Sequence, residues 1–418
     1  MHSSVTTDGN QRKMENVSLN TIIQQHGSPC YAYSKRAISE NFLDYQRALS
    51  SRDHLICYAV KSNSNIAVLQ TLAKLGAGFD IVSAGELERV LLAGGDPAKV
   101  VYSGVAKTAD EMRRALEVGI HCFNVESESE LKLLNKTAAE KNHLAPVSLR
   151  VNPDVDAKTH PYISTGLKEN KFGIDLNRAY EVYQQAASME NISVVGVDCH
   201  IGSQLTDITP FLDAMQHLLV LVDRLAKSGI TLKHIDIGGG LGVRYQDEVV
   251  PSLSSYMDAL LPLIKNRSET LIMEPGRSIT ANAGILLTQV QVIKHNGDKN
   301  FAIVDAAMND MLRPALYDAW MDINSVEIKA DRAEDNYDVV GPICETGDFL
   351  AKDRTLAIAE GDYLYLSSAG AYGFTMSSNY NSRPRVAEVM VDDNRIHLIR
   401  ARETIKDLIR GEQLIKEQ

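Results

Sequence analysis

LICYAVK at residues 55–61 is an apolar run that ends directly at Lys61. A short apolar run that stops at a charge is typical of a buried strand. Similar runs recur downstream, and longer stretches with helical spacing of apolar residues separate them. One such stretch, Ala84–Ala93, ends at Gly94, a common helix stop signal. This alternation is typical of βα units around a parallel sheet.

Eight apolar runs follow this rhythm, and they predict an α/β fold built as a closed (β/α)8 TIM-type barrel. The barrel is expected to span residues 36–278. In this fold, the active site lies at the carboxyl ends of the strands. The runs are Leu55–Val60, Phe79–Ser83, Val100–Ser103, Cys122–Val125, Val147–Val151, Val194–Cys199, His234–Ile237 and Leu271–Met273.

The ends of these runs are unusually polar. Because the carboxyl ends of parallel strands meet at one mouth of a barrel, we expect their side chains to share one site. A random set of strand ends would carry fewer charged and amide groups. The residues at or just past the ends are Lys61, Asp80, Ser83, Asn124, Glu126, Arg150, Asn152, His200, Gly238, Gly239, Gly240, Glu274 and Arg277.

The rhythm changes after about residue 278, where short β-like runs follow one another without long helices. Asp392-Asp393-Asn394 between two of them is typical of a hairpin turn. These runs predict an all-β C-terminal domain, a β-barrel or sandwich, over residues 279–418. Residues 1–15 are polar and are predicted to be disordered. The β-like runs are Gly284–Lys294, Phe301–Asp305, Tyr337–Val340, Asp362–Ser367, Arg385–Val391 and Arg395–Arg400.

The composition argues against several classes of function. The formal net charge is −11 and no basic run is present, which argues against a nucleic-acid partner. No stretch approaches the roughly 18 apolar residues of a membrane span, and residues 1–20 lack an apolar signal core. The five cysteines never fall at C-x-x-C spacing, so neither a metal site nor a disulfide framework is expected. The expected location is the cytoplasm.

Lys61 has two interpretations. A lysine at the mouth of a barrel is partly desolvated, which favours the neutral amine that covalent chemistry on a carbonyl group needs. An isolated lysine at a strand end would instead extend to solvent. The polar ends of the other strands favour the functional interpretation.

Three consecutive glycines, Gly238, Gly239 and Gly240, follow the strand His234–Ile237. Such a run lets backbone N–H groups approach a phosphate closely. The segment does not match G-x-G-x-x-G, because Val243 occupies the last glycine position, and the chain has no Walker A motif. Taken alone, a tight structural turn explains the run equally well.

Further strand ends could complement a ring-shaped cofactor. Glu274 could pair with a protonated pyridine nitrogen, which keeps the ring cationic and strengthens it as an electron sink. His200 could stack on the ring, and Ser203 could reach a phosphate. The alternatives are a weak surface pair of Glu274 with Arg277 and a purely structural histidine.

Candidate substrate contacts lie in the β-rich half. Arg313 and Tyr317 are four residues apart, so on a helix they would share a face. With Arg277 and Tyr372 they could hold a substrate carboxylate. The alternatives are a solvated helix face for the first pair and an inert buried thiol for Cys344.

In combination, these segments resemble the fold-type III pyridoxal-phosphate decarboxylases, and most closely the bacterial diaminopimelate decarboxylases. The resemblance runs from about residue 20 to the C-terminus. Ser62 and Thr346 stand where alanine and serine are common, and neither carries the chemistry. The matching segments are 58–63, 78–86, 150–153, 170–173, 199–204, 238–240, 274–277, 344–346 and 370–373.

The resemblance implies pyridoxal 5'-phosphate as cofactor and a role for each site residue. The implied catalytic residues are Lys61, which binds the cofactor covalently, Cys344, which protonates the substrate carbanion, and His200. The implied substrate contacts are Arg277, Arg313, Tyr317, Glu345 and Tyr372. The implied cofactor contacts are Lys61, Asp80, Arg150, His200, Ser203, Gly238, Gly239, Gly240, Glu274, Gly276, Arg277 and Tyr372.

The resemblance also implies the reaction and the assembly. The reaction is decarboxylation of meso-2,6-diaminopimelate to L-lysine and CO2, the last step of lysine biosynthesis. The assembly is a homodimer in which Cys344 and Glu345 reach the active site of the partner subunit. Residues 16–35 are expected to join the β domain.

Four alternatives stay open at this point, one of them a structural barrel without a cofactor, for which the polar strand ends would need another explanation. A decarboxylase of ornithine or arginine would want an acidic pocket for the cationic end of its substrate, and Arg313 argues against that. A racemase would favour an arginine opposite the pyridine nitrogen, where Glu274 is expected. A non-enzymatic pyridoxal-phosphate-binding protein would resemble a bare barrel without residues 279–418.

Overall fold

The computed structural model describes residues 4–155 and 170–416 of the chain. The chain divides into two units, one formed by Ser39–Ile279 and the other by Met1–Ile38 together with Thr280–Gln418. The barrel boundaries expected from the sequence, 36 and 278, differ from these by three residues and one residue. None of the helices in the described part of the chain is long and apolar enough to cross a membrane.

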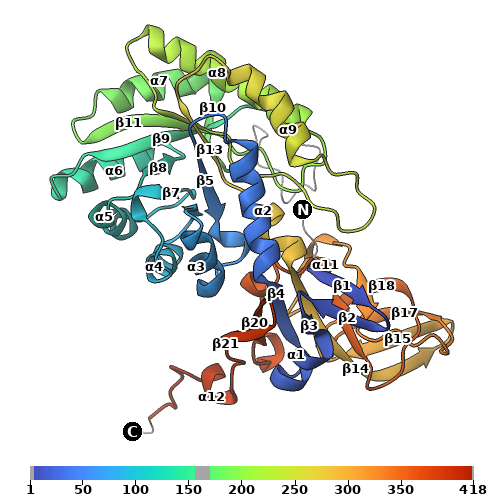
Figure 1. The fold of residues 1–418 in the computed structure, drawn as a ribbon. Coiled ribbons are helices and arrows are strands. Elements are labelled where there is room, and N and C mark those ends of the chain that lie inside the picture. The colour runs from blue at the N-terminus through green and yellow to red at the C-terminus, as the bar shows by residue number, and fades with distance from the viewer. Residues whose placement is uncertain (1–3, 156–169, 417–418) are drawn as a thin grey trace. The chain divides into compact units, whose positions relative to one another are not determined.

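Within the described residues, eight parallel strands of the first unit close into a ring, which confirms the predicted barrel (Figure 1). Each strand pairs with the next one along the chain, and the last pairs with the first. A short strand, β10 (Ile174–Asp175), adds to the edge of β9. The ring strands are β5 (His54–Ala59), β6 (Gly78–Ile81), β7 (Val100–Tyr102), β8 (Cys122–Val125), β9 (Ala145–Asn152), β11 (Ile192–Asp198), β12 (His234–Asp236) and β13 (Thr270–Met273).

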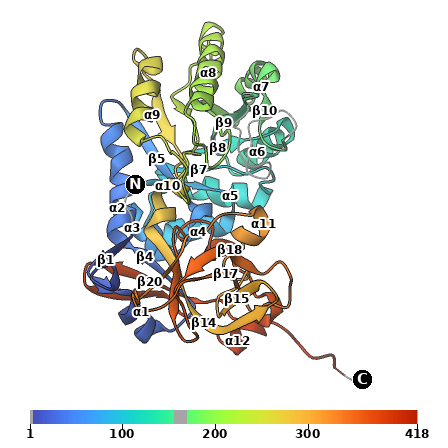
Figure 2. The same ribbon diagram turned by 90° about the vertical axis from the view of Figure 1, so that its right-hand side faces the viewer.

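Helices lie around the outside of the strands, as Figure 2 shows. Several helices begin with an N-cap residue. The side chains of Ser83, Thr108 and Ser127 each accept a hydrogen bond from the backbone N–H three residues later. Such caps satisfy N–H groups that have no partner inside the helix. The helices are α2 (Lys35–Ala48), α3 (Ile66–Lys74), α4 (Ala84–Leu92), α5 (Ala109–Val118), α6 (Glu128–Glu140), α7 (Leu176–Ala187), α8 (Thr209–Lys227) and α9 (Leu253–Leu260).

The inside of the barrel is layered, because side chains two apart on a strand point to the same face. A buried apolar layer is formed by Cys57, Val101, Cys122, Val195 and Ile272. Polar residues follow two positions later on several of these strands, as in Cys122 and Asn124 or Ile272 and Glu274. The layering places the polar groups at the carboxyl end of the strands.

The second unit is built on one large sheet, in the order β18-β17-β15-β14-β4-β20-β21. Its longest strand, β14, pairs with β15, β19 and β4. Strand β4 comes from the segment 16–35 and also pairs with β20. The strands are β4 (Cys30–Ser34), β14 (Gly284–Asn296), β15 (Lys299–Val304), β16 (Ile323–Ser325), β17 (Asp335–Val340), β18 (Phe349–Leu356), β19 (Tyr363–Leu366), β20 (Ala387–Asp392) and β21 (Arg395–Arg400).

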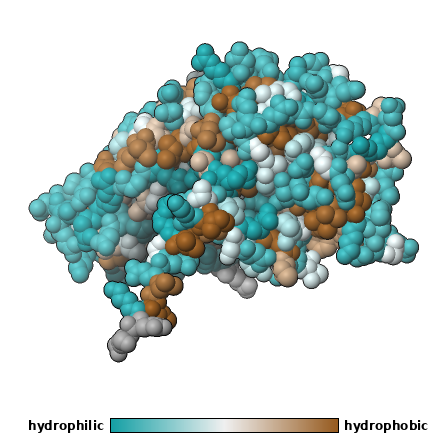
Figure 3. All heavy atoms as spheres, turned by 90° about the horizontal axis from the view of Figure 1, so that it is seen from below, coloured by the Kyte–Doolittle hydropathy of each residue, from teal (hydrophilic) through white to brown (hydrophobic). Residues whose placement is uncertain are grey.

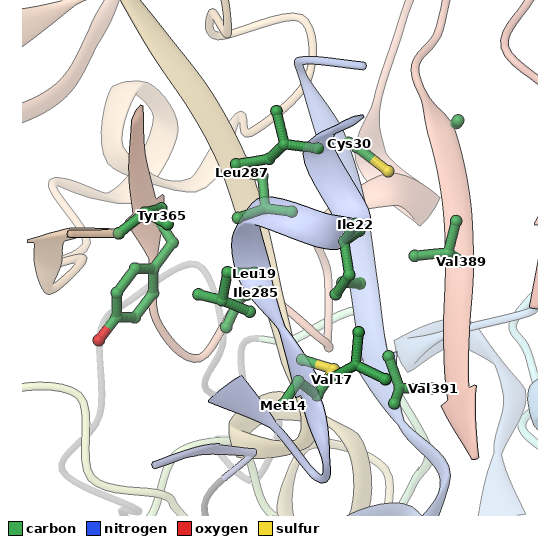
Figure 4. Packing of buried hydrophobic residues seen from close by; sticks show 14 residues of the cluster. Met14, Val17, Leu19, Ile22, Cys30, Ile285, Leu287, Tyr365, Val389 and Val391 are labelled. Atoms are coloured by element: carbon green, nitrogen blue, oxygen red, sulfur yellow. The ribbon is translucent and has the colours of Figure 1, made fainter. Parts of the chain in front are cut away.

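The hydrophobic core of this unit joins residues from distant parts of the chain (Figure 4). Helix α1 (Leu19–His26) buries Leu19 and Ile22, and these pack with Leu287 of β14 and Val389 of β20. The contribution of α1 and β4 explains why the N-terminal segment belongs to this unit rather than to the barrel.

The prediction of disorder for residues 1–15 is wrong for the described residues. β1 (Val5–Asp8) pairs antiparallel with β2 (Gln11–Met14), which pairs with β3 (Val17–Ser18). Met14 is fully buried in the same core. The strands are polar because most of their residues face solvent, which hides them from a hydrophobicity pattern. Residues 1–3 lie outside the described residues.

Candidate active site

Lys61 and Asp80 form an ion pair at the carboxyl end of the barrel. Lys61 follows β5, and its Nζ lies 2.5 Å from Oδ2 of Asp80 on β6. The Asp80 side chain is fully buried, whereas that of Lys61 is 35% exposed. Asp80 Oδ1 is buried and finds no hydrogen-bond partner among the described residues. A buried acceptor without a donor is unfavourable, so this atom points to a polar ligand.

Three buried carboxyl groups meet on neighbouring strands. Asp198, Asp236 and Glu274 each offer an oxygen within 4.8 Å of the others. Burial raises the pKa of Asp198 to about 7, and it raises the pKa of Asp236 and Glu274 well above the ordinary range. The neighbouring carboxylates raise the pKa of Glu274 further. A cationic group bound beside Glu274 would therefore be favoured, because it would relieve this repulsion.

Arg150 partly neutralises this acidic layer. Its Nη1 lies 3.2 Å from Glu126 Oε1, and its Nε lies 3.9 Å from Asp198 Oδ2. Burial lowers the pKa of Arg150, but Glu126 and Asp198 raise it more, so the net pKa lies above its ordinary value. Arg150 therefore stays a cation. The guanidinium also lies over the Phe172 ring, 4.9 Å from its centroid.

The glycine run passes between His200 and Glu274. Gly239 donates its N–H to His200 Nδ1 at 3.2 Å, and a Cβ on Gly239 would lie 2.2 Å from the Glu274 carbonyl oxygen. Gly238 and Gly240 have φ angles of +65° and +112°, which other residues rarely adopt. Burial lowers the pKa of His200 well below its ordinary value, so the ring is neutral. Because Nδ1 accepts a bond, the proton belongs on Nε2.

A cluster of hydrogen-bond donors lies beside these glycines. Arg277, the first residue of α10 (Arg277–Thr280), donates from Nη1 to Tyr245 Oη at 2.7 Å and from Nη2 to Ser203 Oγ at 3.0 Å. Its side chain is buried. Gly276 packs closely, since a Cβ there would lie 3.0 Å from Ala59 and Ser62. A buried guanidinium flanked by two hydroxyl groups is well suited to a phosphate.

The remaining predicted residues belong to the second unit. Arg313 and Tyr317 are the first and last residues of α11 (Arg313–Tyr317), and Arg313 is buried. Tyr372 is half-buried with φ of +54°. Cys344 and Glu345 are exposed; Cys344 donates its N–H to Asn381, and Glu345 accepts from Tyr380 Oη at 3.3 Å. The predicted barrel residues therefore lie together at one end of the barrel. The other five belong to the second unit: Arg313, Tyr317, Tyr372, Cys344 and Glu345.

Two residues of the site were not singled out for a role by the sequence. Glu126 was noted only as a polar strand end, yet it accepts from Arg150 and from the N–H groups of Gly104 and Gly173. Tyr245 follows the glycine run by a few residues, and its contact with Arg277 joins segments 32 residues apart. Proximity to the glycine run was the one available signal for Tyr245.

The donor set matches a phosphorylated, cationic ring that carries a carbonyl group. Lys61 supplies an amine, Glu274 a buried carboxyl group, and Ser203, Tyr245 and Arg277 supply phosphate donors. Pyridoxal phosphate has these three features.

Comparison with known proteins supports this match. Residues 35–281 match the family model described as the pyridoxal-binding domain of pyridoxal-dependent decarboxylases. The chain is 62% identical over 401 residues to diaminopimelate decarboxylase of Pseudomonas aeruginosa, covering 96% of each chain. It is 58% identical over 404 residues to that of Vibrio cholerae, covering 96% of this chain and 97% of that one.

Solved structures agree with the sequence comparison. Diaminopimelate decarboxylase of Helicobacter pylori, solved in complex with L-lysine, superposes with a TM-score of 0.91 at 44% identity, covering 94% of this chain and 98% of that one. The fold, the pyridoxal-binding region and the full-length similarity agree. This chain therefore belongs to the diaminopimelate decarboxylases, a family of carboxy-lyases that depend on pyridoxal phosphate.

Proposed function

We propose that this enzyme removes one carboxyl group of meso-2,6-diaminopimelate as CO2 and releases L-lysine. The observation that carries the proposal is the Lys61–Asp80 ion pair, which presents an amine beside the buried Glu274 at the carboxyl end of a closed barrel. The names of relatives at 45–62% identity over nearly the whole chain point to the same substrate.

Lys61 would hold the cofactor covalently through its Nζ amine, the group that Asp80 Oδ2 contacts at 2.5 Å. The bound cofactor supplies an electron sink for the electron pair left on Cα when CO2 departs. Glu274 would support this sink by pairing with the ring nitrogen, and His200 would contact the ring. Asp80 positions the Lys61 amine, and Arg150 balances the charge of the carboxyl groups.

Residues that follow three strands would hold the cofactor phosphate. The buried Arg277 and the hydroxyl of Ser203 are already hydrogen-bonded to each other, so their positions are set before binding. Gly276 admits a close approach. The remaining contacts are Gly238, Gly239, Gly240 and Tyr372.

Substrate recognition uses Arg277, Arg313, Tyr317, Glu345 and Tyr372. The distal end of meso-diaminopimelate carries both a carboxylate and an ammonium group, which suit a guanidinium and a carboxylate respectively. Cys344 donates a proton to Cα after CO2 leaves, and its exposure on this chain leaves the thiol accessible.

The active form in this proposal is a homodimer with shared sites. Cys344 and Glu345 are exposed on this chain, which would let them reach the active site of the partner subunit. Exposed apolar residues also follow one another toward the C-terminus, where Figure 3 shows brown side chains. They are Ile405, Ile409, Leu414 and Ile415. The proposal also includes a cytoplasmic location, which the five free thiols support.

Carbon dioxide release should be compared across meso-diaminopimelate, ornithine and arginine with the purified enzyme. Arg313 favours the first, because a guanidinium repels the cationic end of the other two. A preference for ornithine or arginine would refute the substrate assignment. The lysine/ornithine decarboxylase of Vibrio vulnificus is 21% identical in sequence, a likeness that carries the fold alone.

A further inference from the structure

A second cluster of metal-ligating side chains lies at the amino end of the barrel strands. His121 directly precedes β8, Cys122 begins β8, and His234 begins β12. One ligand atom from each of the three lies within 4.8 Å of the other two. All three lie two or more residues before the polar layer of their strands. Cys122 Sγ lies 3.7 Å from Asn124 Oδ1, and Asn124 donates to Glu274, so one residue stands between this cluster and the cofactor site.

We propose that His121, Cys122 and His234 bind one Zn²⁺ ion, with a water molecule as the fourth tetrahedral ligand. Zinc bound at about 2.0–2.1 Å to nitrogen and about 2.3 Å to sulfur requires tetrahedral ligand atoms about 3.3–3.6 Å apart. Cys122 Sγ already lies 3.9 Å from His234 Nε2. The ring centroids of the two histidines are 5.2 Å apart. The separations of the three ligand atoms, all within 4.8 Å, would have to close by about 1.5 Å at most.

The hydrogen bond of His121 leaves the correct nitrogen for a metal. His121 Nδ1 lies 3.2 Å from the Ala98 carbonyl oxygen. A carbonyl oxygen only accepts, so Nδ1 carries the proton and Nε2 keeps its lone pair. Zinc-binding histidines usually have their second nitrogen fixed in this way.

The His234 ring packs closely against the backbone of Gly196. A Cβ on Gly196 of β11 would lie 1.9 Å from His234 Nε2, so a side chain at this position would displace the imidazole. His234 is 2% exposed, and its Nε2 contacts the Cys122 thiol among the described residues. A thiol is a weak donor, which makes a buried imidazole poorly satisfied without a further ligand.

The position in the barrel indicates a structural role. Barrel chemistry takes place at the carboxyl ends of the strands, whereas the amino end serves stability. Joining β8 to β12 by a metal ties together two strands on different parts of the ring. Zinc binding is therefore expected to raise the melting temperature of the enzyme without changing kcat, since a ligand of the folded state alone stabilises it.

The test uses the cofactor-loaded enzyme after dialysis against a chelator. Titration with Co²⁺ should give a thiolate-to-cobalt charge-transfer band, and Zn²⁺ should displace it at one equivalent per chain. Cys122→Ser should lose the band. His121→Gln should weaken binding about tenfold or more, since loss of one ligand or its fixing partner has effects of at least this size.

Matched variants separate this cluster from other thiols and imidazoles. Cys344→Ser removes the exposed thiol, and His143→Gln removes an exposed histidine of the same unit; both should bind as the parent enzyme does. Because Cys122 is buried and its variant could misfold, His121→Gln, at a half-buried position, serves as the second test. Absence of a thiolate band in the parent enzyme, or unchanged binding in His121→Gln, would overturn the proposal.

Discussion

Lys61 Nζ lies 2.5 Å from Asp80 Oδ2, and the two residues come from neighbouring strands whose register places Asp80 opposite Ala59. The fully buried carboxylate holds the amine toward the inside of the barrel mouth rather than toward solvent. The ion pair therefore fixes the direction in which the Lys61 amine points.

Lys61→Ala is expected to lose the visible absorbance of the lysine-bound cofactor and to reduce kcat by several orders of magnitude, because the covalent attachment is gone. Absorbance and CO2 release measure the two effects. Lys74→Ala, at an exposed position of the same unit, is the matched control and should leave both unchanged. Retention of the absorbance band in Lys61→Ala would show that another group holds the cofactor.

Arg277→Ala is expected to weaken cofactor binding about 10- to 100-fold, since charge-assisted hydrogen bonds are each worth about 1.5–3 kcal/mol. Ser203→Ala should show a smaller loss in the same direction, because a neutral hydroxyl contributes less. Titration of the cofactor-free enzyme with pyridoxal phosphate gives the affinities. Arg178→Ala, which removes an exposed guanidinium from α7, should bind normally. Equal affinities for the Arg277 variant and the parent would exclude the phosphate role.

Glu274→Gln is expected to keep the cofactor but to lower kcat about 100-fold or more, by analogy with the loss of one positioned electrostatic group. The amide cannot carry the negative charge that stabilises a protonated ring nitrogen. Steady-state kinetics and the absorbance band together distinguish this outcome from loss of the cofactor. An unchanged kcat would place the ring nitrogen elsewhere.

Mixing inactive Lys61→Ala subunits with inactive Cys344→Ala subunits is expected to restore about a quarter of the parent activity if sites are shared in a homodimer. Random exchange would make half of the dimers mixed, and each mixed dimer would hold one intact site. The control is Lys61→Ala mixed with itself, which should stay inactive. No recovery after verified subunit exchange would contradict shared sites.

Asp310→Asn tests a buried carboxyl group of the second unit. Burial raises the pKa of Asp310 from its ordinary 3.8 to about 7. Between these values the folded chain holds a proton that the unfolded chain has lost, so stability falls as pH rises from about 4 to about 7. The effect of this residue is on the order of 4 kcal/mol at most.

Melting temperatures measured at about pH 5 and about pH 7 give the result. The parent enzyme should lose more stability across this interval than Asp310→Asn, whose amide does not titrate. Asp298→Asn is the control, because Asp298 is an exposed carboxylate of the same unit. The same pH dependence in Asp310→Asn and the parent would refute the raised pKa.

The barrel and most of the residues at its mouth could be predicted from the sequence alone. Strand runs are short and local, and their apolar content follows from burial on both faces. The predicted run Cys122–Val125 coincides with β8, and the residues that follow each run lie at the carboxyl end. Once the strands close in chain order, Lys61, Asp80 and Glu274 must lie at the same mouth.

Features that depend on partners far away in the chain are visible only in the folded structure. In the polar β1–β2 hairpin, Met14 is the one deeply buried side chain. It packs in a core that includes Leu287 and Val389. β18, missed in the sequence, forms at the end of a sheet by pairing with β17. Hydrophobic periodicity carries little information about such strands.

The same distinction holds for the two clusters in the barrel. Tyr245 reaches Arg277 across 32 residues, and Cys122 meets His234 across 112. Spacing rules for ligands work only where one loop or helix supplies them. Here closure of the ring brings residues of β8 and β12 into contact. Strand register, rather than distance along the sequence, sets side-chain contacts across a barrel. Such contacts are therefore visible only in the three-dimensional structure.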